Sequence, residues 1–264
     1  VDSANKTNDE CISEIYQYLR KEYQNEYYYK NTLLNKLLLG VHSPRTTTAL
    51  TEVPVAKSKA DFILINGKGS ATYNNSLMAM DMLIEEHPEC EGKIHIYSHD
   101  GGSYSAGYGQ PAVMAAKMAQ EGRSVEEINA YLEESIARRR IYFGIYNLKY
   151  AGKSGRIPSA AAFIGDKIGI KPIMKIWDHE ITTAGKCRGE KKVVSKICDM
   201  AIADMEPGSE YQIEYGNDEK IKEEMAAKMT EKLGYGPTGY FQIGAEVAAN
   251  AGPRIVGVAF DAKK

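Results

Sequence analysis

The chain has 264 residues, enough to bury one large hydrophobic core or two of medium size, so two domains are the starting expectation. Its hydrophobic (43%) and charged (26%) fractions are those of an ordinary globular protein, which excludes a disordered chain, a collagen-like repeat and a coiled coil. A formal net charge of -2 lacks the excess of Lys and Arg that a broad nucleic-acid surface needs, so nucleic acid is not an expected partner.

Membrane and metal chemistry find no support in the sequence. No apolar run approaches the roughly 20 residues of a membrane helix, and the polar start of the chain has no secretory apolar core. We therefore expect a cytoplasmic protein without stable membrane insertion. The four cysteines are scattered, with no Cys-x-x-Cys and no His at zinc-ligand spacing, which predicts reduced thiols and no metal site: Cys11, Cys90, Cys187 and Cys198.

The amino-terminal third predicts helices, a loop and then a buried strand. Apolar positions near helical spacing between residues 11 and 39 predict one or two helices, and Ser43 to Thr48 predicts a loop. Residues 60–66 form a short continuous apolar run, which is typical of a strand buried on both faces. A Gly-rich turn, Gly67 to Ser70, then leads to a predicted helix over residues 73–86.

The same order of strand, turn and helix comes a second time. Residues 93–97 predict a strand, Gly101-Gly102 a turn and residues 110–120 a helix. This repetition indicates a parallel sheet with helices on both faces. The next helix is expected to start at Ser124, whose hydroxyl can cap it while Glu127 stands at the capping-box position.

We place the domain boundary after Arg140, which gives an amino-terminal α/β domain over residues 1–140 and a carboxyl-terminal domain over residues 141–264. The second domain is expected to be a two-layer α/β structure with helices on one face of its sheet, and Asp178-His179 predicts a hairpin turn. Its expected elements are a strand over 141–145, a helix over 160–164, the hairpin strands 173–177 and 180–184, a helix over 191–205, a strand over 210–215, a helix over 218–233, and strands over 240–243 and 255–260.

The segment Ser70-Ala71-Thr72-Tyr73 opens a helix after a buried strand, so its hydroxyls and free backbone N–H groups could hold an anionic oxygen. An ordinary helix cap by Ser70 or Thr72 explains the same residues and is favoured from spacing alone. The Gly67-Lys68-Gly69-Ser70 turn lacks the spacing of a P-loop, which gives ATP binding little support.

Three other polar segments also have simple structural explanations. Thr46, Thr47 and Thr48 can satisfy a turn, Arg188 to Lys192 can be a solvated helix start, and Asn250 to Pro253 can be a turn. In isolation those explanations are favoured. The five histidines do not combine with a Ser or Cys in a recognisable triad order, so no motif indicates nucleophilic catalysis.

Taken in order, these segments resemble the DegV family from about Arg45 to the end of the chain. The match rests on five elements of the family, Thr-Ser-Gln-Pro-Ser, Ser-Gly-Thr-Tyr, Leu-x-x-Gly-Gly-Arg-Ile, Arg-Gly-x-Lys-Lys and Ile-Gly-x-x-Ile-Gly-Ala-His-x-Gly-Pro. Here they correspond to Arg45–Ala49, Ser70–Tyr73, Tyr150–Ile157, Arg188–Lys192 and Ile243–Pro253.

The resemblance implies a two-domain DegV-like α/β fold that holds a long-chain fatty acid in a tunnel between the domains, with no cofactor and no catalysis of its own. The carboxylate would be bound by hydroxyl groups of Thr46, Thr47, Ser70 and Thr72. Arg188 and Asn250 would stand near the carboxylate mouth, where family members dock a fatty acid kinase. In that scheme the partner kinase supplies the phosphoryl chemistry for phospholipid synthesis, and this bacterial protein presents the acid.

Several positions depart from the family pattern. Asn250 stands where the family has His, and a neutral Asn supplies no positive charge to a carboxylate or acyl phosphate. Ala71 replaces a Gly and Ala49 a Pro, and Val1-Asp2-Ser3 is the nearest counterpart of the family's first-strand element, which predicts an abbreviated amino-terminal domain.

Two alternatives to fatty acid binding stay open. One is a small hydrolase or phosphotransferase that uses the Gly67–Ser70 turn as an anion site, which requires a metal or general base nearby. The other is an interaction module of related fold that has lost its ligand.

Overall fold

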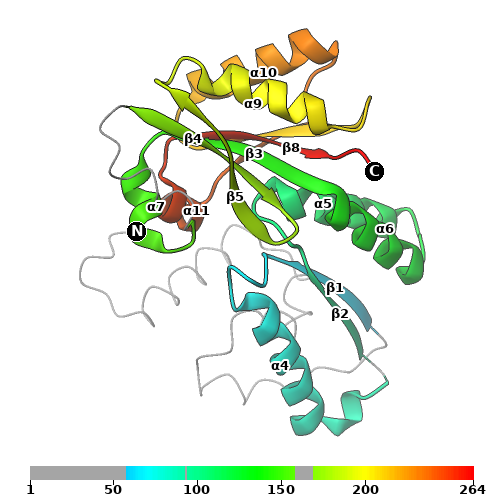
Figure 1. The fold of residues 1–264 in the computed structure, drawn as a ribbon. Helices are drawn as coiled ribbons and strands as arrows, with labels where there is room; N and C mark the ends of the chain where they lie inside the picture. Colours follow the sequence, from blue (N-terminus) through cyan, green and yellow to red (C-terminus); the bar gives the residue numbers. More distant parts are fainter. Residues whose placement is uncertain (1–57, 93, 158–168) are drawn as a thin grey trace, which may run out of the picture. The chain divides into compact units, whose positions relative to one another are not determined.

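The computed structural model of the protein describes residues 58–92, 94–157 and 169–264 (Figure 1). The larger of two compact units contains residues 60–74 and 96–264, and the remaining described residues belong to the other unit. In chain order the elements are β1 (Ser58–Leu64), α4 (Thr72–Glu86), η2 (Pro88–Cys90), β2 (Ile94–Asp100), α5 (Ala106–Gln120), α6 (Val125–Arg138), β3 (Arg139–Ile145), α7 (Leu148–Ser154), β4 (Ile170–Trp177), β5 (Glu180–Arg188), α9 (Val193–Asp204), β6 (Tyr211–Tyr215), α10 (Glu219–Leu233), β7 (Gly239–Gln242), α11 (Ala245–Ala251) and β8 (Ile255–Asp261).

A six-stranded sheet with the order β5-β4-β3-β8-β6-β7 forms the centre of the larger unit. The strands pair antiparallel except for β6 and β7, which are parallel. The longest straight register joins β3 to β8, from Arg139 opposite Asp261 to Ile145 opposite Ile255. These are the strands predicted from the apolar runs, so the mixed α/β architecture is confirmed.

Side chains that alternate along each strand divide the core between the two faces of this sheet. On one face α9 and α10 pack against Tyr142, Val258 and Phe260 (Figure 1). On the other, Ile141 and Phe143 pack with residues of α5, α7 and α11, for example Ala106 and Ala151 and Ala251. The expectation of helices on one face therefore describes α9 and α10, while α5, α7 and α11 cover the opposite face as well.

The β4–β5 hairpin turns at the predicted dipeptide. Trp177 lies opposite Glu180, and the two residues between them have positive φ angles, 50° at Asp178 and 65° at His179. Positive φ at both central residues is the geometry of a two-residue turn whose twist matches the flanking strands. The strands are longer than predicted because the pairing continues to Ile170 opposite Arg188.

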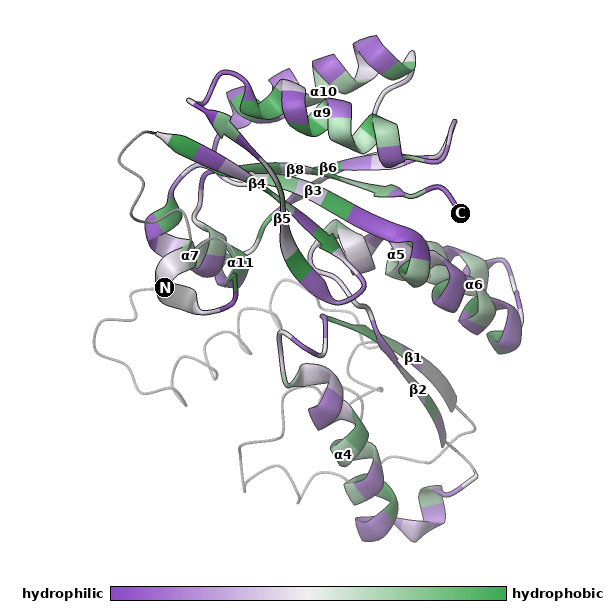
Figure 2. Cartoon of the chain, in the orientation of Figure 1, coloured by the Kyte–Doolittle hydropathy of each residue, from purple (hydrophilic) through white to green (hydrophobic). Residues whose placement is uncertain are grey.

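The start of α6 has the predicted capping box. The Glu127 backbone N–H donates to the Ser124 Oγ at 3.2 Å, and the Ser124 backbone N–H donates to the Glu127 Oε2 at 2.9 Å. Ile128 and Leu132 are buried, and Figure 2 shows the outward side of α6 as hydrophilic. The helix is therefore amphipathic, and its apolar side packs against α5.

The first two described strands form a small sheet. The Gly101 N–H donates to the Leu64 carbonyl oxygen at 2.8 Å, so the carboxyl ends of β1 and β2 lie together and the strands are parallel, as predicted. The helices expected between residues 11 and 39, the loop Ser43–Thr48 and the helix expected over 160–164 lie outside the described residues. The domain boundary after Arg140 stays a prediction.

No helix in the described ranges is both long and apolar enough to cross a membrane.

Candidate ligand-binding site

A cavity of about 400 Å³ lies within the larger unit, in the size range of small-molecule sites. Its walls are mostly apolar and come from strands of the central sheet, from α11 and from the loops that follow β1 and α7. The apolar residues include Ile65, Phe143, Ile157, Ile176, Ile181 and Ile255, and the polar ones are Ser70, Tyr104, Ser105, Arg156, Glu214, Glu246 and Asn250. An apolar space with several polar groups suits an amphipathic ligand.

Asn66 holds the loop that carries Ser70. The Asn66 side chain is completely buried, and its Oδ1 accepts a hydrogen bond from the Lys68 N–H at 3.0 Å. Its backbone carbonyl accepts the N–H groups of Gly69 and Ser70, both at 3.0 Å. The loop is therefore a tight hydrogen-bonded turn, and this turn fixes the Ser70 backbone at the cavity wall.

Ser70 combines the two functions considered from the sequence. Its Oγ lies 2.7 Å from the Thr72 Oγ1 and accepts a hydrogen bond from the Thr72 N–H at 3.3 Å, as a residue at the start of a helix does. The same residue lines the cavity. Local capping therefore does not prevent the Ser70 hydroxyl from facing a ligand.

Tyr104 brings a phenol group to the same loop. Its hydroxyl lies 3.4 Å from the Asn66 Nδ2, and a Cβ atom at Gly69 would overlap it. Burial raises the pKa of Tyr104, and the nearby positive charge of Arg156 offsets part of the rise. The phenol is therefore protonated at neutral pH and can donate a hydrogen bond, and Arg156 supplies the cation of the cavity wall.

Glu214 adds a buried carboxyl group to the wall. Its Oε1 accepts a hydrogen bond from the Ala106 N–H, the first residue of α5, at 2.8 Å. Burial raises the pKa of Glu214 to about 7, against the opposing effects of the Ala106 bond, of Arg139 and of a Ser105 hydrogen bond. This carboxyl group therefore changes charge near neutral pH.

The structure brings two of the predicted site residues, Ser70 and Asn250, to the same cavity. The Asn250 Nδ2 donates to the Glu246 carbonyl oxygen at 2.7 Å, which fixes the amide on α11. Thr72 contacts Ser70, and Arg188 is exposed at the end of β5; neither of them is among the residues that line the cavity. Thr46 and Thr47 lie outside the described residues. The assigned roles stay predictions.

Five polar lining residues were not assigned a role from the sequence: Tyr104, Ser105, Arg156, Glu214 and Glu246. Arg156 stands inside the Tyr150–Ile157 segment on which the family resemblance rests, which was a usable signal. Glu214 is an acidic residue in a short strand that is otherwise largely buried. This was a second signal, because a buried carboxyl group needs a polar partner. No sequence pattern indicated Tyr104, because only the fold brings it to the loop of Asn66.

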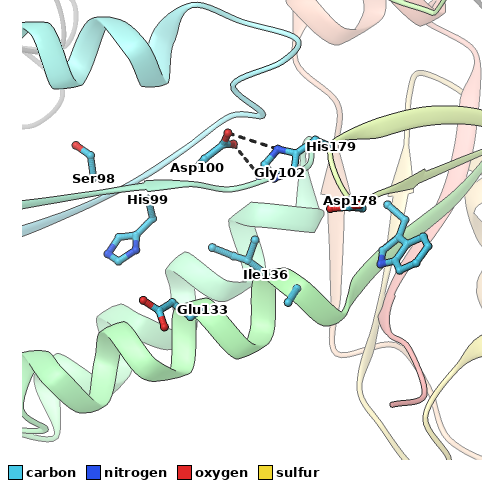
Figure 3. Close-up of a pocket in the computed structure, with 10 residues that line it drawn as sticks. Ser98, His99, Asp100, Gly102, Glu133, Ile136, Asp178 and His179 are labelled. Carbon is cyan, nitrogen blue, oxygen red and sulfur yellow. Dashed lines mark hydrogen bonds and ion pairs between the residues drawn. The ribbon is translucent and has the colours of Figure 1, made fainter.

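A second, more polar pocket of about 600 Å³ lies where β2, α6 and the hairpin turn meet (Figure 3). Asp100 and His179 point toward each other there, with 3.4 Å between the Asp100 Oδ2 and the His179 Nδ1. The Asp100 Oδ1 also accepts the N–H groups of Gly67 and Gly102, at 2.9 and 3.0 Å. His99, in the same pocket, lies 3.4 Å from Asp61.

The Asp100–His179 pair stands beside the Gly67–Ser70 turn, where the hydrolase alternative needs a base. The contacts of the Ser70 hydroxyl are with Thr72, however, and the imidazole contacts Asn66 and Asp100. Within the described ranges there is no group of three or more His, Cys, Asp or Glu placed to hold a metal ion. In the described part of the chain, the Ser70 hydroxyl is therefore not hydrogen-bonded to this imidazole.

The sequence of the chain is similar to one family of known proteins. A family model described as "uncharacterised protein, DegV family" matches residues 42–263. A DegV domain-containing protein of Caldanaerobacter subterraneus subsp. tengcongensis is 30% identical over 207 residues, which are 76% of this chain and 70% of that protein.

Two solved structures have a similar fold. The stearic acid-binding protein of Eubacterium ventriosum has a TM-score of 0.69 at 20% identity, over 97% of this chain and 84% of that one. A DegV family protein of Thermus thermophilus, described for its fatty acid binding, has a TM-score of 0.64 at 25% identity, over 75% of this chain and 69% of that one.

Proposed function

Because the chain belongs to the DegV family, we propose that it binds a long-chain fatty acid in the 400 Å³ cavity and presents the carboxylate to a partner fatty acid kinase. The observation that carries this proposal is the composition of the cavity wall, which combines isoleucines from three strands and three loops with a small polar group around Ser70. The fatty acids bound by the similar proteins of Eubacterium ventriosum and Thermus thermophilus support it.

The apolar wall supplies the affinity. Each methylene removed from water contributes about 0.8 kcal/mol, so an acyl chain with ten or so buried methylenes gains about 8 kcal/mol before the cost of ordering it. Phe143, Ile176 and Ile255 come from the interior of the sheet and have fixed positions. A preformed apolar wall keeps that ordering cost low for the protein.

The polar group orients the carboxylate. The Ser70 hydroxyl and the protonated Tyr104 phenol are hydrogen-bond donors, and the Arg156 guanidinium adds a positive charge. Hydrogen bonds from charged donors offset the desolvation of a carboxylate better than neutral ones do. Arg156 thus takes the cationic role that Asn250 cannot provide.

Delivery to a kinase is the finer part of the proposal. Arg188 is exposed at the end of β5 and is followed by the exposed Lys191 and Lys192 at the start of α9. This basic edge has the charge expected of a surface that contacts an anionic partner or an acyl phosphate. We therefore assign Arg188 to docking and not to the cavity.

Mass spectrometry of organic extracts from the purified protein tests the binding step. We expect near-stoichiometric fatty acid in the wild type, a strong reduction in Ser70→Ala and in the Ser70→Ala/Thr47→Ala double variant, and no change in the exposed control Thr182→Ala. A well-folded wild type that neither carries nor takes up added fatty acid would contradict the proposal.

The delivery step is tested separately, with a fatty acid kinase, ATP and the loaded protein. Acyl phosphate should form with the wild type and much less with Arg188→Gln, while the affinity of Arg188→Gln for the fatty acid stays at the wild-type value. If Arg188→Gln supports the same rate as the wild type, Arg188 does not dock the kinase.

A further inference from the structure

Glu214 is a cavity residue that the binding of an unsubstituted acyl chain does not use. Side chains alternate along β6, so Tyr211 and Ile213 pack into the core under α9 and α10 while Gln212 and Glu214 face the other side. Glu214 is only 4% exposed, and it lines the cavity beside Phe143 and Ile255. A carboxyl group thus stands on the same wall as these two apolar side chains.

The contacts of Glu214 leave it able to bind a further donor. Its Oε1 accepts the Ala106 N–H, and the Ser105 side chain provides a second hydrogen bond. A carboxyl group offers about four acceptor positions when ionised, so these two bonds do not exhaust it. Arg139 donates to the Ala106 carbonyl oxygen at 3.3 Å, and its positive charge favours the ionised form of the Glu214 carboxyl group.

Ser105 itself is held in an uncommon backbone conformation. Its φ angle is 46°, in the left-handed region that residues other than Gly rarely adopt, and it directly precedes α5. Ser105 also lines the cavity. Backbone strain of this kind persists where the surrounding structure fixes it, and it is concentrated at ligand sites. Ser105 and Glu214 therefore form one polar pair within the apolar space.

An unsubstituted acyl chain does not suit this pair. Methylenes packed against Glu214 would leave the remaining acceptor positions of its buried carboxyl group without a hydrogen-bond donor, which weakens binding. A hydroxyl group on the acyl chain would replace that bond by donating to the carboxylate or accepting from the carboxylic acid. The wall therefore favours an acyl chain that carries a hydroxyl at the depth of Glu214.

We propose that Glu214 and Ser105 form a second polar subsite, which recognises a hydroxyl group on the bound acyl chain, and that the preferred ligands are hydroxy fatty acids. This inference rests on the proposed fatty acid function and specifies its substrate class. The carboxylate is oriented by the group around Ser70, and the hydroxyl position on the chain is selected by Glu214.

Binding assays on the wild-type protein test the inference directly. The probes are stearic acid and a set of hydroxystearic acids that differ in the position of the hydroxyl. At least one of the hydroxystearic acids should bind about tenfold more tightly than stearic acid. If stearic acid binds at least as tightly as every hydroxystearic acid, the inference is overturned while the fatty acid function stands. If none of the acids binds, the proposed function fails and the inference with it.

Variants then locate the recognition. Glu214→Gln keeps both an acceptor for the Ala106 N–H and hydrogen-bonding capacity in the cavity, so it should retain most of the preference for the hydroxylated acid. Glu214→Leu should lose the preference, and Ser105→Ala should reduce it, while the exposed control Glu210→Gln keeps it. A preference that survives in Glu214→Leu overturns the assignment. If Glu214→Leu does not fold, the same decision rests on Ser105→Ala, whose unchanged preference would overturn it.

Discussion

Asn66 and His179, which are far apart in the sequence, are joined by two contacts. The Asn66 Nδ2 donates to the His179 carbonyl oxygen at 2.9 Å, and the Asn66 Oδ1 lies 3.3 Å from the His179 Nδ1. The first residue follows β1 and holds the loop of Ser70, and the second is in the hairpin turn that leads to Ile181. This contact therefore ties together two parts of the cavity wall.

Replacing Asn66 by Ala should destabilise the protein by about 2 to 3 kcal/mol, because it removes the hydrogen bonds that a completely buried amide makes with the His179 carbonyl oxygen and the Lys68 N–H. Urea unfolding measures the free energy. The exposed Asn74→Ala variant is the matched control and should change stability by less than about 0.5 kcal/mol. Fatty acid affinity should also fall in Asn66→Ala, and equal stability of the two variants would contradict a structural role for the amide.

Local sequence signals predicted much of the fold. The Asp178-His179 turn and the Ser124–Glu127 capping box depend on neighbouring residues, and both are present. The sequence predicted that α5 starts at Gln110, because Gly107, Gly109 and Pro111 are poor helix formers. In the structure the helix starts earlier, at Ala106. Packing overrides this weakness: a Cβ at Gly107 would collide with Ser103 and Ile141, so Gly lets the helix approach the sheet closely.

The candidate site was only partly predictable, because contacts between distant parts of the chain bring some of its residues together. Ser70 and Asn250 were selected by resemblance to family motifs, and the fold brings both to one cavity. Tyr104 and Glu214 reach the cavity through long-range packing and strand alternation, which a pattern of neighbouring residues does not encode. The family resemblance predicted that Arg188 stands with Asn250 near the carboxylate mouth. Arg188 is exposed at the end of β5, where it pairs with Ile170 of β4, and its role stays a prediction.

Ser124→Ala should lower stability by about 1 kcal/mol, because the Glu127 N–H at the start of α6 loses its acceptor. Ser124→Asp keeps an acceptor at the cap and should remain close to the wild type. Thermal or urea unfolding distinguishes the two. Equal loss in both variants would mean that the hydroxyl has some other function than capping.

Gly69→Ala should weaken fatty acid binding by about tenfold with a smaller effect on folding, because the new Cβ overlaps the Tyr104 hydroxyl and must displace the ring from the cavity wall. Gly236→Ala is the control, since its Cβ would come no closer than 3.8 Å to the Thr230 Oγ1. Titration with a fluorescent fatty acid measures both variants. Wild-type affinity in Gly69→Ala would show that the Tyr104 position is unimportant for binding.

Arg156→Gln should weaken binding of stearic acid by about tenfold or more and leave binding of stearyl alcohol nearly unchanged, because only the acid carries the charge that the guanidinium stabilises. Isothermal titration of both ligands against both proteins separates head-group recognition from burial of the chain. Arg123→Gln, at an exposed position just before α6, serves as the control. Equal losses for acid and alcohol would indicate that Arg156 shapes the cavity without recognising charge.

Glu214 should make the stability of the folded protein depend on pH. Burial raises its pKa from 4.5 to about 7, so between these values the folded protein holds a proton that the unfolded chain releases. The stabilising contribution of this group is therefore complete below about pH 4.5 and is lost as the pH rises to about 7, a decrease of up to about 3 kcal/mol. The lowered pKa values of Glu190 and Asp218 give the opposite trend, with stability lost as the pH falls.

The contribution of Glu214 is isolated by the difference between the wild type and Glu214→Gln, since both proteins share the other carboxylates. Urea unfolding across about pH 5 to 8 should show the Gln variant gaining stability relative to the wild type as the pH rises, and this difference should become constant above about pH 7, where Glu214 is ionised in both folded and unfolded chains. Glu210→Gln, at an exposed position, should give no such trend. Parallel pH profiles for the wild type and Glu214→Gln would mean that the buried carboxyl group does not titrate in this range, and that its hydrogen bonds with Ala106 and Ser105 keep it ionised in the folded protein.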